Sequence, residues 1–194
     1  MLLNILNQIN WVDIFILILG VRICYVAVKN GFPAELFKLI GTVAAIYLSL
    51  HYYVSLSGSI KGWLSLGERL PEDFLQFIVF LGLAVAGYYA FMVLRSIFYR
   101  FLKTEAVSAL NKWGSLILGI VRTLLLASLI MFTFVISSVS YFDNSVKASY
   151  TGKRLFMVAP QTYSWLWNNF VSKFAAGEKY NETVTLTSEE FLVK

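Results

Sequence analysis

Four long apolar stretches dominate the first 140 residues of the chain and are separated by shorter polar segments. They cover residues 11–28, 32–54, 74–94 and 114–139. A helix needs about 20 predominantly apolar residues to cross the roughly 30 Å hydrocarbon core of a bilayer. The pattern therefore predicts an all-α polytopic membrane protein with four transmembrane helices in a compact bundle.

The three connections between these stretches differ in character. The first is short, and its Gly31 and Pro33 suit the end of one helix and the start of the next. The second, residues 55–73, mixes glycine, proline and charged residues, and we expect an exposed loop or a loop with one short interfacial helix. In the third, residues 95–113, cations alternate with aromatic residues, which is typical of the lipid headgroup layer.

The chain becomes polar after residue 139. Aromatic and apolar residues then recur at helical spacing, which predicts an amphipathic helix on the membrane surface: Tyr163, Trp167, Phe170, Val171 and Phe174. A helix seated in a groove of a partner protein is the alternative. We therefore divide the chain into a transmembrane domain (1–140), a polar linker with this interfacial helix (141–174) and a mobile polar tail (175–194).

The composition agrees with residence in a bilayer. Apolar residues make up 58% of the chain, charged residues 14%, and the mean hydropathy is +0.70, against about 45–50% apolar and about 25% charged in soluble domains. The net charge of +5 is better explained by membrane topology than by nucleic acid. We expect the lipid bilayer and other membrane proteins as partners, leave homo-oligomers open, and expect neither nucleic acid nor a cofactor.

The distribution of basic residues predicts an orientation. With four crossings, both termini share one side of the membrane with residues 55–73, while the first turn and residues 95–113 share the other. The latter side has eight cations near it, Arg22, Lys29, Lys38, Arg95, Arg100, Lys103, Lys112 and Arg122, against five on the former, Lys61, Arg69, Lys147, Lys153 and Arg154. Cytoplasmic loops are enriched in Lys and Arg, so we expect the first and third connections in the cytoplasm and both termini outside it.

Charged side chains inside the apolar stretches are the main candidates for function, because each is costly in hydrocarbon. Arg22, Glu35, Lys38 and Arg122 all approach the same leaflet, and Arg122 lies deepest, roughly 12 Å from Gly114 along its helix. We predict an ion pair of Glu35 with Arg22 or Arg122. The alternative is that Arg22, Lys38 and Arg122 extend to the headgroups and only anchor their helices.

Three further polar residues have simpler interpretations. Asp13 lies at the start of the first span, where it either caps the helix or has a function of its own. His51 stands beside Tyr52 and Tyr53 without other ligands at metal-binding spacing, so we interpret it as an interfacial histidine. Cys24 is interpreted as a small packing residue rather than a reactive thiol.

Small residues recur every four positions in three of the stretches and predict faces for close helix packing. The series are Gly41, Ala45 and Ser49, then Gly82, Ala86 and Ala90, and then Ser115, Gly119, Thr123 and Ala127. Small residues are common in membrane helices, so one such series can arise by chance. Three series favour a tight bundle.

Motifs for catalysis are missing from the sequence. There is no Walker loop, no Gly-x-Ser-x-Gly segment, no paired histidines at ligand spacing and no Cys-x-x-Cys. We assign no catalytic, cofactor-binding or metal-binding residues and do not expect an enzyme.

Two sets of short motifs resemble a known family. The first set is Trp11-Val12-Asp13, Lys29-Asn30-Gly31-Phe32, Glu35-Leu36 and His51-Tyr52-Tyr53; the second is Leu110-Asn111-Lys112-Trp113-Gly114 and Gly119-Ile120-Val121-Arg122. Their order and spacing resemble the CvpA family of colicin V production proteins. The matching motif positions are Asp13, Gly31, Glu35, Asn111, Gly114, Gly119 and Arg122. The chain departs from the family pattern at Asn30 and Lys112, where Arg is usual, and at Thr123, where Gly is usual.

The resemblance implies a four-helix bacterial inner-membrane protein associated with production or export of a peptide toxin and with envelope homeostasis. Termini outside the cytoplasm are then periplasmic, and periplasmic proteins join membrane proteins as expected partners. Three functions are compared on this basis. The first is a non-enzymatic accessory or scaffold protein, and the second is an oligomeric small channel or transporter that uses Arg22, Glu35 and Arg122. The third, an interfacial enzyme, lacks a recognisable nucleophile and base.

Overall fold

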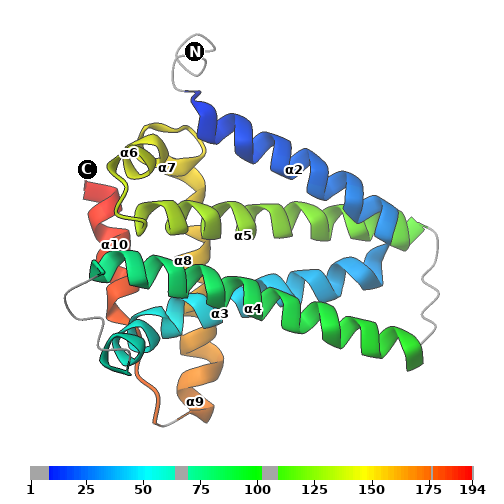
Figure 1. The fold of residues 1–194 in the computed structure, drawn as a ribbon. Coiled ribbons are helices and arrows are strands. Elements are labelled where there is room, and N and C mark those ends of the chain that lie inside the picture. The colour runs from blue at the N-terminus through cyan, green and yellow to red at the C-terminus, as the bar shows by residue number, and fades with distance from the viewer. Residues whose placement is uncertain (1–8, 64–69, 102–108, 176, 194) are drawn as a thin grey trace.

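The computed structural model describes residues 9–63, 70–101, 109–175 and 177–193, and every regular element among them is a helix (Figure 1). The long helices are α2 (Trp11–Asn30), α3 (Phe32–Trp63), α4 (Glu72–Phe101) and α5 (Ser115–Val135), the last preceded by the π-helical turn η1 (Leu110–Gly114). The shorter elements are α6 (Ser140–Ala148), α7 (Gly152–Leu155), α8 (Val158–Leu166), η2 (Trp167–Val171), α9 (Ser172–Phe174) and α10 (Glu182–Val193). The predicted all-α architecture is confirmed.

Four helices are long and apolar enough to span a membrane, at Trp11–Asn30, Phe32–Trp63, Glu72–Ile97 and Asn111–Val135. The protein is therefore a polytopic membrane protein with the predicted number of spans. Of the residues used to predict its orientation, Arg69 and Lys103 lie outside the described part of the chain.

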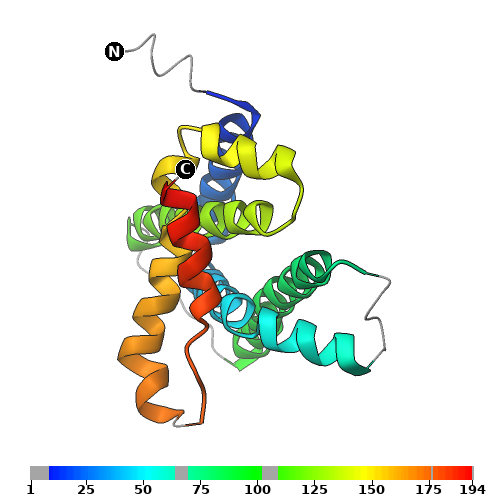
Figure 2. The same ribbon diagram turned by 90° about the vertical axis from the view of Figure 1, so that its left-hand side faces the viewer.

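Two helices continue into segments expected to be connections. Helix α3 extends to Trp63, and its last turns run across the end of the bundle in Figure 2. Serines in this segment do not end the helix because their hydroxyls bond to the helix itself: Ser57 donates to the Val54 carbonyl at 2.8 Å and Ser59 to the Ser55 carbonyl at 3.0 Å. Helix α4 extends to Phe101. The expected loop over residues 55–63 is thus helical.

The spans pack so that α5 lies between α2 and α3, and α3 lies between α5 and α4. Fully buried side chains such as Ile46, Phe80 and Phe132 fill the contacts. The remaining faces of α2 and α4 carry large exposed apolar side chains, for example Leu17 and Val93. Lipid covers such faces in a membrane, so their exposure agrees with the membrane assignment.

The elements from α6 to α10, residues 140–193, gather at the end of the bundle where α2 begins and α5 ends (Figures 1 and 2). We call them the terminal layer. Ser128 of α5 attaches them to the bundle: its Oγ donates to the Phe156 carbonyl at 2.6 Å and accepts from the Ala159 N–H at 2.7 Å. The described chain begins, before α2, and ends, with α10, at this end, as the four-crossing topology predicts.

The expected mobile tail is wrong for residues 182–193, which form α10. Val184, Ser188 and Phe191 are buried on one face of this helix, and the Phe191 ring stacks on Phe156 with centroids 3.8 Å apart. Their spacing of four and three residues is the helical period. The signal is weak because only two of the three residues are apolar.

The predicted amphipathic helix is present as α8, η2 and α9, which follow one another without a break from Val158 to Phe174. Tyr163 is buried against the bundle, whereas Phe170 is 50% and Phe174 87% exposed. The choice between a membrane surface and a partner protein for this exposed part stays a prediction.

The small residues of α3 and α5 lie at helix contacts as predicted. A Cβ added at Gly119 would lie 2.7 Å from the Ala27 Cβ of α2, and one at Gly41 would lie 2.9 Å from the Phe91 Cβ of α4. Thr123 packs against Gly20, whose added Cβ would lie 3.1 Å from the Thr123 Cγ2. Ser115 is also buried, and its hydroxyl donates to the Lys112 carbonyl at 2.9 Å.

The prediction of which small residues of α4 face a neighbouring helix is wrong. Gly82 and Ala86 are both exposed, and a Cβ at Gly82 would meet nothing within 4 Å. Gly87 makes the close contact instead, since its added Cβ would lie 2.9 Å from the Ala45 Cα of α3. The large side chains Val79 and Phe80 decide which face of α4 is buried, and Gly87 lies two turns beyond them on that face.

Candidate functional site

Three of the four predicted intramembrane charges, Glu35, Lys38 and Arg122, form one buried cluster at the end of the bundle opposite the terminal layer. The first turn of α3 places Glu35 against Arg122 of α5, with 3.0 Å between Glu35 Oε2 and Arg122 Nη1. Lys38, one turn further along α3, donates to Glu35 Oε1 at 2.6 Å, and the Asn30 side-chain amide donates to the same oxygen at 3.3 Å. Glu35 is 0%, Arg122 4% and Lys38 8% exposed. The predicted pair is therefore Glu35 with Arg122.

The alternative of simple anchoring fits only one of the three cations. Arg22 is exposed on α2, and the structure gives it no ion pair with Glu35. Lys38 and Arg122 instead direct their charges into the protein, where they share one carboxylate. Anchoring at the headgroups is thus wrong for Lys38 and for Arg122.

The cluster carries one negative and two positive charges, so its formal net charge is +1. Charges so enclosed are stable only when they are paired, because desolvation costs several kcal/mol per ion. Glu35 Oε2 and Arg122 Nε have no aligned hydrogen-bond partner among the described residues. The cluster joins α3 to α5 by ion pairing, and all of its charged members are nearly inaccessible.

Two family-motif positions meet beside this cluster. Asn111 Oδ1 accepts a hydrogen bond from the Phe32 N–H at 2.7 Å and thereby caps the start of α3. Gly31, just before it, has φ +82°, and any Cβ there would collide with the Asn111 side chain. Gly114 ends the π-helical turn that carries Asn111. The turn between α2 and α3 therefore packs closely against η1, the segment that leads into α5.

Asp13 lies at the opposite end of the bundle. Its Oδ2 accepts from the Asn10 N–H at 2.9 Å in a capping box at the start of α2, so the capping role is confirmed. Asp13 Oδ1 also accepts from the Thr151 N–H at 2.7 Å and from the Thr151 hydroxyl at 2.6 Å. The same carboxylate thus holds the terminal layer on α2, a contact across 138 residues that no local pattern indicates.

His51 is buried under the terminal layer rather than exposed at an interface. Its Nδ1 lies 2.9 Å from the Tyr163 hydroxyl and its Nε2 3.0 Å from Glu178 Oε2, and its ring stacks on Trp167. Hydrogen bonds from His51 and Tyr52 hold the pKa of Glu178 below its ordinary value of 4.5, while burial raises the pKa of Tyr163. The sequence analysis singled out the motif His51-Tyr52-Tyr53, but it could not identify the partners of His51, which are distant in the chain.

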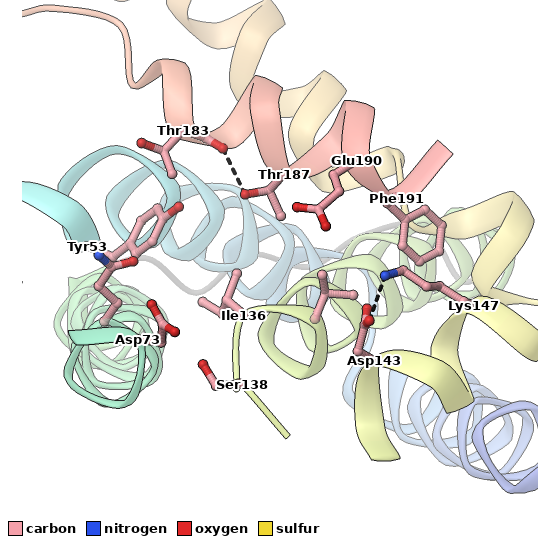
Figure 3. Close-up of a pocket in the computed structure, with 12 residues that line it drawn as sticks. Tyr53, Asp73, Ile136, Ser138, Asp143, Lys147, Thr183, Thr187, Glu190 and Phe191 are labelled. Carbon is pink, nitrogen blue, oxygen red and sulfur yellow. Dashed lines mark hydrogen bonds and ion pairs between the residues drawn. The ribbon is translucent and has the colours of Figure 1, made fainter. Parts of the chain in front are cut away.

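The terminal layer contains an open cavity of about 290 Å³ between α3, α4, α6 and α10 (Figure 3). Asp73, Asp143, Glu190 and Lys147 line it, giving a formal net charge of −2. Lys147 donates to Asp143 Oδ2 at 2.6 Å. Among the described residues, no group of three or more His, Cys, Asp or Glu is arranged to hold a metal ion. Sequence reasoning missed this cavity because α10 was not expected.

Comparison with known families assigns the chain. The model of the family described as colicin V production protein matches residues 12–160. The chain belongs to the colicin V production (CvpA) family. The match includes the Glu35 and Arg122 cluster and the contact between Asp13 and Thr151, whereas α10 lies beyond it. No curated protein and no solved structure matches the chain.

Proposed function

We propose that this CvpA-family protein is a non-enzymatic scaffold of the bacterial inner membrane that recruits partners for production or export of a colicin V-type peptide toxin and for envelope homeostasis. One observation carries the proposal: Glu35, Lys38 and Arg122 are ion-paired with one another and nearly inaccessible, while the terminal layer keeps an open, polar cavity. The part of the molecule that is available to a partner therefore lies outside the lipid.

The closed ionic cluster supports a structural role for the transmembrane domain. Glu35 is fully buried and bound by cations from α3 and α5. A group with this arrangement is costly to separate from its partners and has little access to substrate. We therefore assign it the task of fixing α3 against α5.

Three attachments give the terminal layer a defined position on the bundle. They are the bonds of Asp13 to Thr151, of Ser128 to Phe156 and Ala159, and of His51 to Tyr163. Each joins a span to a different part of the layer. A rigidly held surface lowers the entropic cost of binding a partner, and the net negative cavity favours a partner with a basic segment.

The orientation follows from the basic residues and forms part of the proposal. The terminal layer lies at the end of the bundle where α2 begins, and the excess of Lys and Arg on the opposite side supports a periplasmic terminal layer. A periplasmic recruiting surface suits a protein that assists export of a peptide.

The oligomeric channel or transporter gains no support from this geometry. Arg122 and Glu35 are 4% and 0% exposed, whereas a conducting path needs polar groups that face water or substrate. Reconstituted vesicles that show substrate flux, abolished by Arg122→Leu, would reverse this preference.

Complementation of a strain lacking the protein tests the scaffold role. We expect the charge-neutralising double variant Asp73→Asn and Glu190→Gln to reach the membrane at normal levels but to restore peptide export and tolerance of envelope stress poorly. Glu189→Gln combined with Asn144→Ala changes exposed residues of α10 and α6 outside the cavity lining and serves as the control. Full complementation by the cavity variant would remove the basis of the proposal.

A further inference from the structure

A second cavity lies on the membrane-facing side of the bundle, between α2 and α5. It has a volume of about 460 Å³ and an almost wholly apolar lining that includes Ile14, Leu17, Val21, Leu124 and Leu155. This volume lies within the roughly 300–1,000 Å³ typical of small-molecule sites. Because its walls belong to two transmembrane helices, the medium that enters it is lipid or another membrane-embedded chain.

The dimensions of this groove match one leaflet. Its lining on α2 runs from Asp13 to Val21, which corresponds to about 12 Å at about 1.5 Å per residue. Half of a bilayer's hydrocarbon core is about 15 Å. Gly20 and Thr123 line the deep part of the groove, where they pack against each other and form its floor. The groove thus extends from the headgroup level to about the middle of the membrane.

The outer end of the groove carries positive charge. Tyr150, Thr151 and Leu155 of the terminal layer line this end. The Arg154 guanidinium lies over the Tyr150 ring, 4.3 Å from its centroid, and Lys153 beside it is also exposed. This cation–π contact restricts the Arg154 guanidinium to the vicinity of Tyr150. Cations close to a membrane surface attract anionic lipid, and Arg154 is tied to the lining of the groove through Tyr150.

The acidic side chain in the described lining does not oppose such a ligand. This residue, Asp13, is 7% exposed. Its carboxylate accepts hydrogen bonds from Asn10, Tyr150 and Thr151, so its charge is directed into the protein. The exposed cations next to this end are Arg154, which contacts the lining residue Tyr150, and Lys153, which precedes it in the chain.

We propose that this groove is a binding site for an anionic phospholipid, with one acyl chain between α2 and α5 and the phosphate at Arg154 and Lys153. The site lies in the leaflet on the side of the termini. It is independent of the recruiting role of the acidic cavity, because it uses a different face of the terminal layer. A bound lipid would also bridge α2 to α7 beside the contact of Asp13 with Thr151.

Native mass spectrometry of the full-length protein, titrated with phosphatidylglycerol or phosphatidylcholine, tests the proposal. We expect one phosphatidylglycerol to be retained in preference to phosphatidylcholine. Replacing both cations, Lys153→Gln with Arg154→Gln, should weaken phosphatidylglycerol binding roughly 10- to 30-fold, from about 1 kcal/mol per cation near a charged surface. Lys173→Gln with Lys179→Gln removes the same charge from exposed positions outside the groove and should have little effect.

Two further arms separate the sources of binding. Val21→Trp fills the deep part of the groove from an exposed position, so it should weaken lipid binding while circular dichroism shows unchanged helicity. Glycerol phosphate, which has the headgroup charge but no acyl chain, should not compete. Arg154→Lys should restore most of the affinity lost in Arg154→Gln.

Several results would overturn the lipid site. They are equal retention of both lipids by the wild type, equal losses in the groove and control double variants, or effective competition by glycerol phosphate. Disulfide crosslinking of Leu17→Cys between copies in a Cys24→Ala background, unaffected by phosphatidylglycerol, would show that a second chain occupies the groove instead.

Discussion

Arg122 and Glu35 lie 87 positions apart in the sequence, yet Arg122 Nη1 is 3.0 Å from Glu35 Oε2 and both side chains are buried. The pair connects the first turn of α3 to the middle of α5. Lys38 adds a second cation to the same carboxylate at 2.6 Å. Glu35 is therefore the common partner of both buried cations.

This asymmetry predicts unequal effects of neutralising the two partners. Glu35→Gln leaves Lys38 and Arg122 buried without a counter-charge and should lower the free energy of unfolding by about 3–5 kcal/mol. Arg122→Met leaves the Glu35–Lys38 pair intact and should cost less, about 1–3 kcal/mol. Unfolding by denaturing detergent measures both values, with exposed Arg22→Gln as a control expected to change little. A larger loss for Arg122→Met than for Glu35→Gln would contradict the assigned pairing.

The contact of α2 with α5 predicts a sharp difference between two glycines. Gly119→Ala introduces a Cβ at 2.7 Å from Ala27 Cβ and should destabilise the protein by about 1–3 kcal/mol through overpacking. Gly82→Ala meets nothing within 4 Å and should be neutral or stabilise by up to about 1 kcal/mol through helix propensity. Thermal unfolding of the two variants in one detergent checks this, and equal effects would contradict the close packing of α2 on α5.

Removing the Thr151 hydroxyl should loosen the terminal layer. Thr151→Val deletes the 2.6 Å hydrogen bond to Asp13, and bonds to charged groups contribute about 1.5–3 kcal/mol. Hydrogen exchange should rise in residues 140–160, with less change in the spans. Thr162→Val is the matched control, because the Thr162 hydroxyl donates only to the Val158 carbonyl of its own helix. A uniform rise in exchange across the chain would argue against a local attachment.

The contact of Glu178 with His51 predicts a dependence on pH. The pKa of Glu178 is lowered from 4.5 by its hydrogen bonds to His51 and Tyr52. Its contribution to stability is therefore fully present above pH 4.5 and is lost as the pH falls through the lower folded-state pKa. The difference in stability between wild type and Glu178→Gln should therefore shrink below pH 4.5. Unfolding is followed by the fluorescence of Trp167, whose ring stacks on His51. A difference that grows on acidification would give the linkage the opposite sign.

The sequence predicted those parts of the fold that lipid imposes directly. Apolar length was enough to find all four spans, and the cost of buried charge was enough to expect a partner for Glu35. The same reasoning placed Gly119 at a helix contact. These features depend on one helix or on one strong energetic penalty.

Features that depend on distant parts of the chain could not be predicted in this way. Helix α10 exposes most of its surface and buries only a few residues, so its periodicity was too weak to identify. The acidic cavity follows from α10 and was missed with it. The register of α4 was wrong because Val79 and Phe80, rather than the small residues Gly82 and Ala86, determine its buried face.

Photo-crosslinking in living cells tests the central claim, recruitment of a partner by the terminal layer, most directly. A photoreactive amino acid would replace Thr187 or Gln76 in the acidic cavity, or Val93 on the lipid-facing side of α4 as the control. We predict a discrete protein adduct from the cavity positions. The double variant Asp73→Asn with Glu190→Gln should reduce both the yield of this adduct and peptide export. No adduct from the cavity, or the same adducts from Val93, would contradict the account.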